Sequence, residues 1–589
     1  MTSAAESPSQ LAADTQNLDM ATYLGLVWAA IFTIFLTHRV VLSTLRYVRQ
    51  VASLGHDRQR IFAYTNSTYA FCKHHLLYAP LYRKRHHREF KLSSAINVGT
   101  LPSRPQAFFL VGYFGMNVAL SVVHLPWSAG RHEIAGYLRN RTGVLAVMNM
   151  IPLFLFAGRN NPLIWMLDIS FDSYNLMHRW IGRTVVLQAL AHTLAWTVDS
   201  VLSSGWHHVS MTLVKSPFLL TGTIGSCAVL LMLLQSPSVI RHAFYEVFLG
   251  VHFLLAATAV VTIWMHLKGL AQQHLLKAAV IFWLIERAIR FWKLIKNNVA
   301  HSRTTAEVTL LPGDAVRVTL HIARPWTFKP GQHVFLYMPR IGLWTSHPFS
   351  LAWSDEGSCV DEKPHSYDID EVLAPRKATM SLIVRRRTGF TERLYHKAES
   401  STTGSFTTTA YVEGPYGMFP WLSSDSANSS VGSQNFDSYG TVMLFAAGVG
   451  ITHQLPHVRS LVAGYANGTC ATRRVVLTWI IQSPEHLEWI RPWMTQILSM
   501  DKRRDALKVL LFITRPRSVK EIHSPSSSVQ MYPGKPDVSA LIAQEQHKQI
   551  GAMAVSVCGT GSLSDDVRKA VRDRCETSEI DFVENAFSW

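Results

Sequence analysis

The chain has 589 residues, a formal net charge of +17 and a hydrophobic fraction of 48%. This length exceeds what one hydrophobic core usually serves, so we expect two or three structural units. The basic residues form no single stripe with interleaved aromatic residues, so we expect no nucleic-acid partner despite the charge. The six cysteines show no CxxC spacing, which argues against a disulfide framework and a thiolate metal site.

Apolar runs long enough to cross a bilayer fill the first half of the sequence. Residues 1–20 are polar and lack the basic region of a cleaved signal peptide, so the first span, from about Ala21 to Leu42, is expected to remain as an anchor. Further spans are expected at roughly 106–127, 142–157, 176–198, 217–234, 248–266 and 274–296. The sequence thus predicts a lipid-embedded domain of about seven helices over residues 21–298.

Basic residues between the first two spans indicate sidedness, because such residues favour the cytoplasmic side of a membrane. They are Arg46, Arg49, Arg58, Arg60, Lys73, Arg83, Lys84, Arg85, Arg88 and Lys91. We interpret them as topology signals and not as a ligand site. With seven spans, the amino terminus then lies outside and the second half of the chain lies in the cytosol.

The second half reads as two soluble domains. From about Ala306, short alternating runs such as VRVTLHI and GQHVFLYMP predict a β-barrel over residues 303–422. A serine-rich stretch from Ser423 to Ser438 follows. Beyond it, the apolar runs TVMLFAAG, RVVLTWII, VLLFITR and MAVSVCG have helical sequence between most of them, which predicts an α/β domain over residues 439–589.

Four histidines share one spacing within two expected spans. His178 and His192 are 14 residues apart, and so are His252 and His266. Fourteen residues at about 100° each return to nearly the same helix face, roughly 21 Å further along the axis. Two such helices offer two levels with one imidazole from each helix, which is the ligand set of two haems. A lone membrane histidine is more often a helix contact, but the repeated spacing favours haem ligation.

These helices resemble those of the ferric reductase and NADPH oxidase superfamily. The string HRWIGR, from His178 to Arg183, is similar to fungal ferric reductases in particular. The resemblance implies two b-type haems. By the topology above, both helices run from inside to outside, so His178 and His252 would hold the inner haem and His192 and His266 the outer one. Arg179 and Arg183 lie at the inner edge, where pairing with haem propionates and plain topological anchoring are both open.

The second half resembles the ferredoxin-NADP reductase type of module, which implies FAD. The family's flavin motif matches His347, Pro348, Phe349 and Ser350, which follow GQHVFLYMP. The resemblance implies that Ser350 contacts the flavin ring and that His347 lies near the isoalloxazine or the diphosphate. The later string RRRTGFTERL matches the family's pyrophosphate contacts with Arg385, Gly389 and Thr391.

A glycine-rich turn after the linker resembles the same family's NAD(P)H site. It comprises Gly448, Val449, Gly450, Ile451 and Thr452, followed by His453 where the NADPH oxidases have proline. Its glycines permit a tight turn and close approach to a dinucleotide pyrophosphate. The EGPYG string of Glu413–Gly417 and the VCGTG string of Val557–Gly561 complete the resemblance, which implies that Cys558 and Gly559 lie beside the reacting ring.

Two further positions affect nucleotide and flavin binding. Relatives often carry an arginine for the 2′-phosphate of NADPH three residues after Trp479, where this chain has Gln482. NADPH and NADH therefore both stay open, with Arg515 or Arg517 as the candidate substitutes. The final residue, Trp589, matches a family aromatic that stacks on the flavin.

These parts predict a transmembrane metalloreductase that carries electrons from cytosolic NAD(P)H through FAD and two b-type haems to ferric or cupric chelates, as in iron or copper acquisition. The alternatives are a superoxide-generating NADPH oxidase and a transporter with a nucleotide-binding tail, although the latter leaves the histidine spacing unexplained. We expect the plasma membrane, or else the vacuolar or another internal membrane, and functional coupling to a metal permease or oxidase.

Histidines at the outer ends of the spans are candidates for docking the metal substrate. They are His124, His132, His274 and, foremost, His207 and His208. Imidazole suits both copper and iron. The alternative is that they are solvated loop residues without a role.

Overall fold

The computed structural model describes residues 8–54, 56, 59–83, 101–300, 302–343, 345–355, 379–417, 435–501, 505–516 and 522–585. The chain divides into two compact units. The first comprises residues 1–40 and 88–289, and the second comprises residues 41–87 and 290–589. Each unit has its own hydrophobic core.

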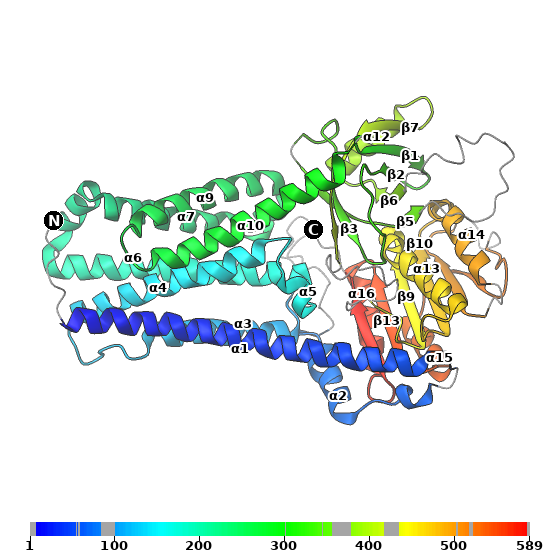
Figure 1. The fold of residues 1–589 in the computed structure, drawn as a ribbon, viewed down its shortest axis with the longest axis horizontal. Coiled ribbons are helices and arrows are strands. Elements are labelled where there is room, and N and C mark those ends of the chain that lie inside the picture. The colour runs from blue at the N-terminus through cyan, green and yellow to red at the C-terminus, as the bar shows by residue number, and fades with distance from the viewer. Residues whose placement is uncertain are drawn as a thin grey trace. The chain divides into compact units, whose positions relative to one another are not determined.

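The first unit is a bundle of long helices that run side by side (Figure 1). The long helices are α1 (Pro8–Ser53), α3 (Arg104–Val122), α4 (Arg131–Ala157), α6 (Phe171–Lys215), α7 (Pro217–Gln235), α9 (Tyr245–His266) and α10 (Gln273–Asn298). Two short helices, α5 (Leu163–Leu167) and α8 (Ser238–Ala243), lie in the connections. Helices α1 and α10 continue beyond the unit's limits at residues 40 and 289.

Six of these helices, within the described residues, are long and apolar enough to cross a membrane. They are α1, α3, α4, α6, α7 and α9. The expected seventh span, residues 274–296, is helical as α10 but is not among the six. It contains Lys277, Glu286, Arg287, Arg290, Lys293 and Lys296. Charged residues thus interrupt the apolar residues of α10, and about seven spans remains a prediction.

The first half of α10 nevertheless packs in the bundle core. Leu276 and Ala279 are fully buried in one cluster with Ile181 of α6. A second contact comes from Glu286, whose Cγ atom would lie 2.9 Å from a Cβ placed on Gly158, the residue that follows α4. Helix α10 is thus part of the first unit's packing, although its composition is that of an amphipathic helix.

Buried amides join α3, α4 and α6 inside the bundle. Asn149 Nδ2 donates to Asn117 Oδ1 at 2.6 Å and to Gln188 Oε1 at 3.0 Å, and Gln188 Nε2 donates to Asn117 Oδ1 at 3.1 Å. Tyr113 Oη donates to Asn149 Oδ1 at 2.8 Å. Such interhelical hydrogen bonds fix the axial register of membrane helices. Because Gln188 lies four residues before His192, this network also positions the histidine-bearing helix.

The second unit begins with an antiparallel barrel of two sheets. The first sheet has the order β5 (Trp353–Asp355), β6 (Thr379–Arg385), β2 (Ala315–His321), β1 (Thr305–Leu311), β7 (Ser405–Thr409). The second has the order β4 (His347–Ser350), β3 (His333–Tyr337), β8 (Tyr411–Tyr416). One helix, α12 (Phe390–Glu399), buries Leu394 against Leu336 and Leu382 of the sheets. The alternating pattern of the sequence therefore forms the barrel that it predicts.

The remaining sheet is parallel and six-stranded, with the order β12 (Val529–Pro533), β11 (Leu507–Ile513), β10 (Arg474–Ile481), β9 (Thr441–Ala447), β13 (Met553–Cys558), β14 (Ile580–Glu584). Helices α13 (Ile451–Asn467), α14 (Arg491–Met500), α15 (Val538–His547) and α16 (Gly561–Arg572) connect strands, as parallel pairing requires. From β9 the chain adds β10, β11 and β12 on one side of the sheet and then β13 and β14 on the other side. The strand order therefore reverses between β9 and β13. Ligands of such sheets bind at this reversal, beyond the carboxyl ends of the strands.

Residues 41–83 belong to the second unit and pack on its α/β domain. They include η1 (Arg60–Ala63), α2 (Ser67–Cys72) and η2 (Lys73–Leu77). Gln59 Nε2 donates to Ala471 O at 2.7 Å. Lys73 is fully buried and forms ion pairs with Glu579 at 2.7 Å and Asp581 at 2.8 Å. For Lys73, interpretation as a topology signal therefore missed a packing role within the soluble unit.

Candidate functional site

The four spaced histidines meet in two pairs. His178 and His192 project from α6, and His252 and His266 project from α9. The ring centroids of His178 and His252 are 6.4 Å apart, and those of His192 and His266 are 6.2 Å apart. Since the first histidine of each helix faces the first of the other, α6 and α9 run parallel. We call His178 with His252 the inner pair and His192 with His266 the outer pair.

Three of these rings are oriented by backbone carbonyls of neighbouring helices. The Nδ1 atom of His178 lies 2.9 Å from Leu153 O of α4, that of His192 lies 2.7 Å from Arg139 O of α4, and that of His266 lies 2.8 Å from Phe218 O of α7. A carbonyl oxygen only accepts, so each Nδ1 carries the proton and each Nε2 keeps its lone pair. His252 differs, because its Nδ1 is buried without a hydrogen-bond partner among the described residues.

Two arginines follow His178 on α6. The Arg183 guanidinium lies over the Trp180 ring at 4.5 Å. The Arg179 Nε atom is buried and has no hydrogen-bond partner among the described residues. A buried donor without a partner costs free energy, so Arg179 has capacity for an anionic ligand beside the inner pair.

The flavin-motif residues form β4, which pairs with β3. Within this register Ser350 lies opposite His333, and Pro348 lies opposite Phe335. The His347 ring stacks on Phe390, the first residue of α12, with centroids 4.5 Å apart. Phe349 lies 6.4 Å from the same ring. The barrel therefore brings the HPFS strand next to the amino terminus of α12.

The expected pyrophosphate contacts converge on that helix terminus. Gly389 is the N-cap of α12 and has a φ of 77°, which favours glycine. Thr391 Oγ1 accepts from the Arg387 backbone N–H at 2.9 Å, which orders the turn. Arg385 ends β6 and contacts Gln482 Oε1 through Nη2 at 3.5 Å. A cation and free helix N–H groups thus lie close in sequence, as an anion-binding site requires.

The glycine-rich turn lies at the reversal point of the parallel sheet. Gly448, with a φ of 53°, Val449 and Gly450 form a single 3₁₀ turn between β9 and α13. Trp479 of β10 fixes this turn, because its Nε1 donates to Gly448 O at 3.0 Å. Thr452 Oγ1 donates to Val449 O at 2.8 Å. The helix that begins at Ile451 therefore presents its first N–H groups at the sheet's carboxyl edge.

Cys558 ends β13 directly beside this turn, in register with Ala446 of β9. A Cβ atom on Gly450 would lie 2.8 Å from the Cys558 carbonyl carbon and 3.4 Å from its Sγ, so only glycine allows this approach. Gly559 is similarly close to Ala447. Burial raises the pKa of the Cys558 thiol to about 12, so it is neutral at physiological pH. Its position suits packing against a ring and not thiolate chemistry.

Gln482 and Arg515 are neighbours at the end of the sheet. The Arg515 backbone N–H donates to Gln482 O at 3.0 Å, and both residues are exposed. The structure thus brings the candidate substitute Arg515 to the position after β10. Arg517 and Trp589 lie outside the described residues, as does most of the serine-rich stretch.

The sequence matches three family models in succession. "Ferric reductase like transmembrane component" matches residues 142–263, "FAD-binding domain" matches residues 300–419, and "Ferric reductase NAD binding domain" matches residues 439–572. The first match contains three of the four paired histidines.

Fungal proteins of one kind are similar over much of the chain. "Ferric/cupric reductase transmembrane component 2" of Saccharomyces cerevisiae is 24% identical over 612 residues, covering 97% of this chain and 78% of that protein. "Ferric reductase transmembrane component 3" of the same yeast is 24% identical, covering 84% and 68%. A "probable cell surface ferric reductase" of Aspergillus oryzae is 29% identical, covering 60% and 44%. The chain belongs to the ferric reductase family. The resemblance seen in HRWIGR is thereby confirmed.

Two glycines of this ferric reductase were not singled out in the sequence. A Cβ on Gly143 of α4 would lie 2.8 Å from His192 Nδ1, and a Cβ on Gly222 of α7 would lie 2.7 Å from His266 Nδ1. Each glycine follows by four residues the carbonyl that the histidine contacts, Arg139 or Phe218. The missing side chain leaves room for the imidazole to reach that carbonyl. Only the histidine spacing was readable in sequence, because this fit needs a second helix.

The ferric reductase also buries two histidines of α13 behind the glycine turn. The His453 and His457 rings are 5.3 Å apart. Burial and, to a smaller extent, the charge of His333 lower the pKa of His453 to about 4. Burial also lowers the pKa of His457 well below its usual value. Both are therefore neutral at physiological pH. His453 stood out in the sequence as a departure from proline, whereas His457 gave no signal.

The histidines that are candidates for docking the metal substrate do not form one cluster among the described residues. His207 and His208 are exposed on the last part of α6, beyond Gly205, where the φ of 76° interrupts the helix. His132, at the start of α4, instead forms an ion pair with Asp199, which Arg139 contacts at 3.0 Å. The structure thus links His132 to α6, the helix that carries His192, which the sequence did not indicate.

Proposed function

We propose that this chain is a transmembrane metalloreductase that passes electrons from cytosolic NAD(P)H, through FAD and two b-type haems, to ferric or cupric chelates across the membrane. The observation that carries the proposal is the pairing of His178 with His252 and of His192 with His266 at nearly equal separations. Two equivalent imidazole pairs along one pair of helices supply a path in two steps. The family membership and the names of the fungal relatives support the choice of metal chelates.

The separation within each pair fits one iron ion between two rings. An imidazole nitrogen binds a first-row metal at roughly 2.0 Å, and the ring centre lies roughly 1.1 Å behind that nitrogen. Two rings on opposite sides of one metal therefore have centres roughly 6.2 Å apart. The observed values are 6.4 and 6.2 Å. These four histidines are accordingly proposed as the residues that would hold the iron of two haems.

The carbonyl contacts support the same role. Ligand histidines usually donate their second N–H to a carbonyl or carboxylate, which fixes the ring and makes it more basic. His178, His192 and His266 have such a contact through Nδ1. The resulting lone pair on Nε2 is what a metal requires. The free donor of Arg179 fits a propionate of the inner haem, and Arg183 is proposed as its neighbour in that role.

The barrel and α/β domains are proposed as the FAD and NAD(P)H sites over residues 303–422 and 439–589, after a membrane domain over residues 21–298. For FAD we propose contacts from His347, Pro348, Phe349, Ser350, Arg385, Gly389, Thr391 and Trp589. For NAD(P)H we propose contacts from Gly448, Val449, Gly450, Ile451, Thr452, Cys558, Gly559 and Arg515. The two phosphate-binding turns at α12 and α13 carry this assignment.

FAD and the haems, when bound, supply the hydride acceptance and single-electron transfer that no side chain of this protein supplies. The protein's own residues orient and enclose the cofactors. Gly450 lets the helix that begins at Ile451 approach Cys558, and burial keeps the Cys558 thiol neutral by raising its pKa. No general acid or base is needed for the outer-sphere reduction of a chelated metal.

The alternative is a superoxide-generating NADPH oxidase, which would use the same electron path. The fungal relatives named as ferric or cupric reductases favour the metalloreductase. We further propose the plasma membrane as the site of action, and coupling to a metal permease or oxidase that takes up the reduced ion.

The deciding experiment is reduction of a ferric chelate by intact cells that express the chain, with superoxide measured in parallel. We expect chelate reduction that exceeds superoxide production and that disappears in a His178→Ala, His192→Ala variant. Superoxide as the main product, unchanged by added chelate, would favour the oxidase.

Nucleotide preference is expected to be weak. Gln482 cannot make the charge-assisted contact that arginine makes with a 2′-phosphate, and Arg515 is its exposed neighbour. Gln482→Arg should raise the NADPH-to-NADH ratio of kcat/KM, and Arg515→Ala should lower it. Gln496→Arg, at an exposed glutamine of α14, is the control and should change nothing. A wild-type preference for NADPH above about a hundredfold, roughly 2.7 kcal/mol, would mean that another group already binds the phosphate.

The docking proposal concerns the exposed outer histidines. If His207 and His208 hold the acceptor near the outer pair, a variant with alanine at both should show a higher KM for ferric or cupric chelate. Haem content and flavin reduction by NAD(P)H should not change. Ser210→Ala, on the same exposed stretch of α6, is the matched control. A KM that is unaltered for both metals would reject docking at these residues and leave the electron path intact.

A further inference from the structure

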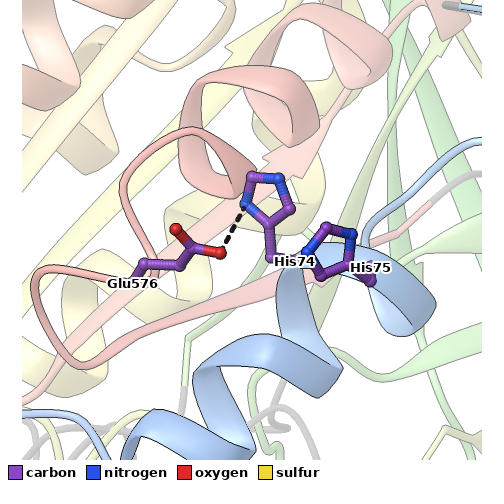
Figure 2. A group of neighbouring side chains, drawn as sticks. All are labelled: His74, His75 and Glu576. Carbon is purple, nitrogen blue, oxygen red and sulfur yellow. Dashed lines mark ion pairs between the residues drawn. The ribbon is translucent and has the colours of Figure 1, made fainter.

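Three metal-ligating side chains meet on the second unit, far from the paired histidines in sequence. His74 and His75 lie on η2, and Glu576 lies in the turn between α16 and β14 (Figure 2). One ligand atom from each residue lies within 4.8 Å of the other two. His74 Nδ1 is 3.4 Å from Glu576 Oε1. The two segments are about 500 residues apart in sequence, so only the fold brings these groups together.

An unusual backbone turn sets the two histidines side by side. The segment Lys73–Leu77 is one turn of π-helix, closed by the hydrogen bond from Tyr78 N to Lys73 O at 2.9 Å. Single π-turns are rare and often occur at functional sites. In this turn the rings of His74 and His75 have centroids only 4.6 Å apart. Consecutive residues are thereby placed so that both can reach one ion.

The surrounding contacts hold this arrangement before any ligand arrives. Buried Lys73, directly before His74, is paired with Glu579 and Asp581, which follow Glu576 on the other segment. Arg572 Nε donates to His74 O at 2.9 Å. Both sides of the cluster are therefore fixed to each other by ion pairs and hydrogen bonds. A preorganised ligand set loses less entropy on binding than a flexible one.

We propose that His74, His75 and Glu576 bind one divalent transition-metal ion of the zinc class, with water completing the coordination. Two imidazoles and one carboxylate suit zinc, copper and iron, whereas calcium and magnesium prefer oxygen ligands alone. His74 Nδ1 also lies 3.1 Å from Arg572 O, and its Nε2 lies 3.5 Å from the Arg572 guanidinium, so an ion bound at Nδ1 replaces the contact with Arg572 O. That guanidinium opposes a cation, so binding is weaker than at a closed structural zinc site. The site is independent of the proposed electron path.

Zinc is the probe, because it is not reduced and so cannot be a substrate of the reductase. The full-length chain in detergent is titrated with zinc against a chromophoric chelator. His75→Ala and Glu576→Gln remove exposed ligands and should fold normally. The matched control is His396→Ala. His396 is exposed and lies 2.9 Å from Glu399, but among the described residues this pair belongs to no group of three metal-ligating side chains.

Wild type and His396→Ala should bind one more zinc ion per chain than His75→Ala and Glu576→Gln, or bind it at least about tenfold more tightly. Because zinc should bind only the folded arrangement, it should also raise the Tm of the first two proteins and not of the last two. Equal zinc content, equal affinity and equal Tm shifts in all four proteins would overturn the proposal. They would identify the cluster as a simple His74–Glu576 ion pair.

Discussion

Gly143→Ala should remove the outer haem from the chain while leaving the inner one. The added methyl would lie 2.8 Å from His192 Nδ1 and 3.1 Å from its Cε1, closer than carbon atoms normally approach these groups. The imidazole must then move away from α4 and lose its 2.7 Å contact with Arg139 O. Loss of such a supporting contact alone costs about 10–100-fold in metal affinity, and the steric displacement adds to that.

The second outer ligand provides an independent form of the same test. A methyl on Gly222 would lie 2.7 Å from His266 Nδ1, whose carbonyl partner is Phe218 O. Gly222→Ala should therefore resemble Gly143→Ala, and both should resemble His192→Ala and His266→Ala. By the same logic, His178→Ala and His252→Ala should remove the inner haem.

The measurement is haem content per chain together with the b-type absorbance spectrum. We expect two haems in wild type and one in Gly143→Ala. Gly136→Ala is the matched control, since Gly136 lies on the same helix and a Cβ there would meet no atom within 4 Å. Two haems and an unchanged spectrum in Gly143→Ala would show that His192 is not held as a ligand at this position. Loss of both haems in Gly136→Ala would point instead to general sensitivity of α4.

The histidines and the glycines differ in how far sequence reveals them. The spacing between His178 and His192 is a property of one helix, so its geometry could be calculated from residue numbers. That Gly143 faces His192 depends on how α4 packs against α6, which no local pattern encodes. The Arg139 carbonyl is a backbone group and leaves no trace in the sequence. Periodicity thus leads to the proposed ligands, whereas the contacts that orient these histidines emerge only with tertiary structure.

Other differences between expectation and structure have similar causes. Helix α10 is expected from its apolar residues, but five of its six charged residues lie from Glu286 onward, and only the packed bundle shows that Leu276 and Ala279 in its first half are buried. Gln482 and Arg515 are neighbours because they follow the paired ends of β10 and β11. Their proximity therefore depends on parallel pairing between these two strands, which the sequence does not state. The barrel and the α/β domain were predicted well because alternation and glycine turns are local signals.

Lys73 is the clearest case of a role that sequence could not reveal, and its removal should strongly destabilise the soluble unit. Its ammonium is fully buried, with Glu579 and Asp581 within 2.8 Å and Ile580 O at 3.3 Å. Lys73→Met would leave two carboxylates near each other without their shared cation. Removing one partner of a buried ion pair typically costs about 3–5 kcal/mol, and we expect a loss of that size in the free energy of unfolding.

The pH dependence of that loss follows from the carboxylate. Burial alone would raise the pKa of Asp581, but the charges of Lys73 and then Arg49 outweigh it and lower the pKa to about 2. A depressed carboxyl pKa stabilises the folded state above the unfolded value, roughly 3.9, and this stability is lost as pH falls towards the folded value. Burial alone would lower the pKa of Lys73, but the charge of Asp581 and its neighbours outweighs burial and raises the pKa. The contribution of Lys73 to the stability of the folded state is therefore present below roughly pH 10.

Wild type and Lys73→Met should therefore differ by a constant amount between about pH 7 and pH 9. The difference should narrow as pH falls further, because the buried carboxylates of the variant gain protons at a higher pH than those of wild type. The measurement is the urea midpoint at which the soluble unit of the full-length chain loses protease resistance. Lys535→Met, at an exposed lysine, is the control and should match wild type. Adding Asp581→Asn to Lys73→Met should recover part of the loss, because it removes one of the two unpaired charges. A midpoint for Lys73→Met equal to that of Lys535→Met would mean that the buried cluster contributes nothing to holding residues 41–83 on the α/β domain.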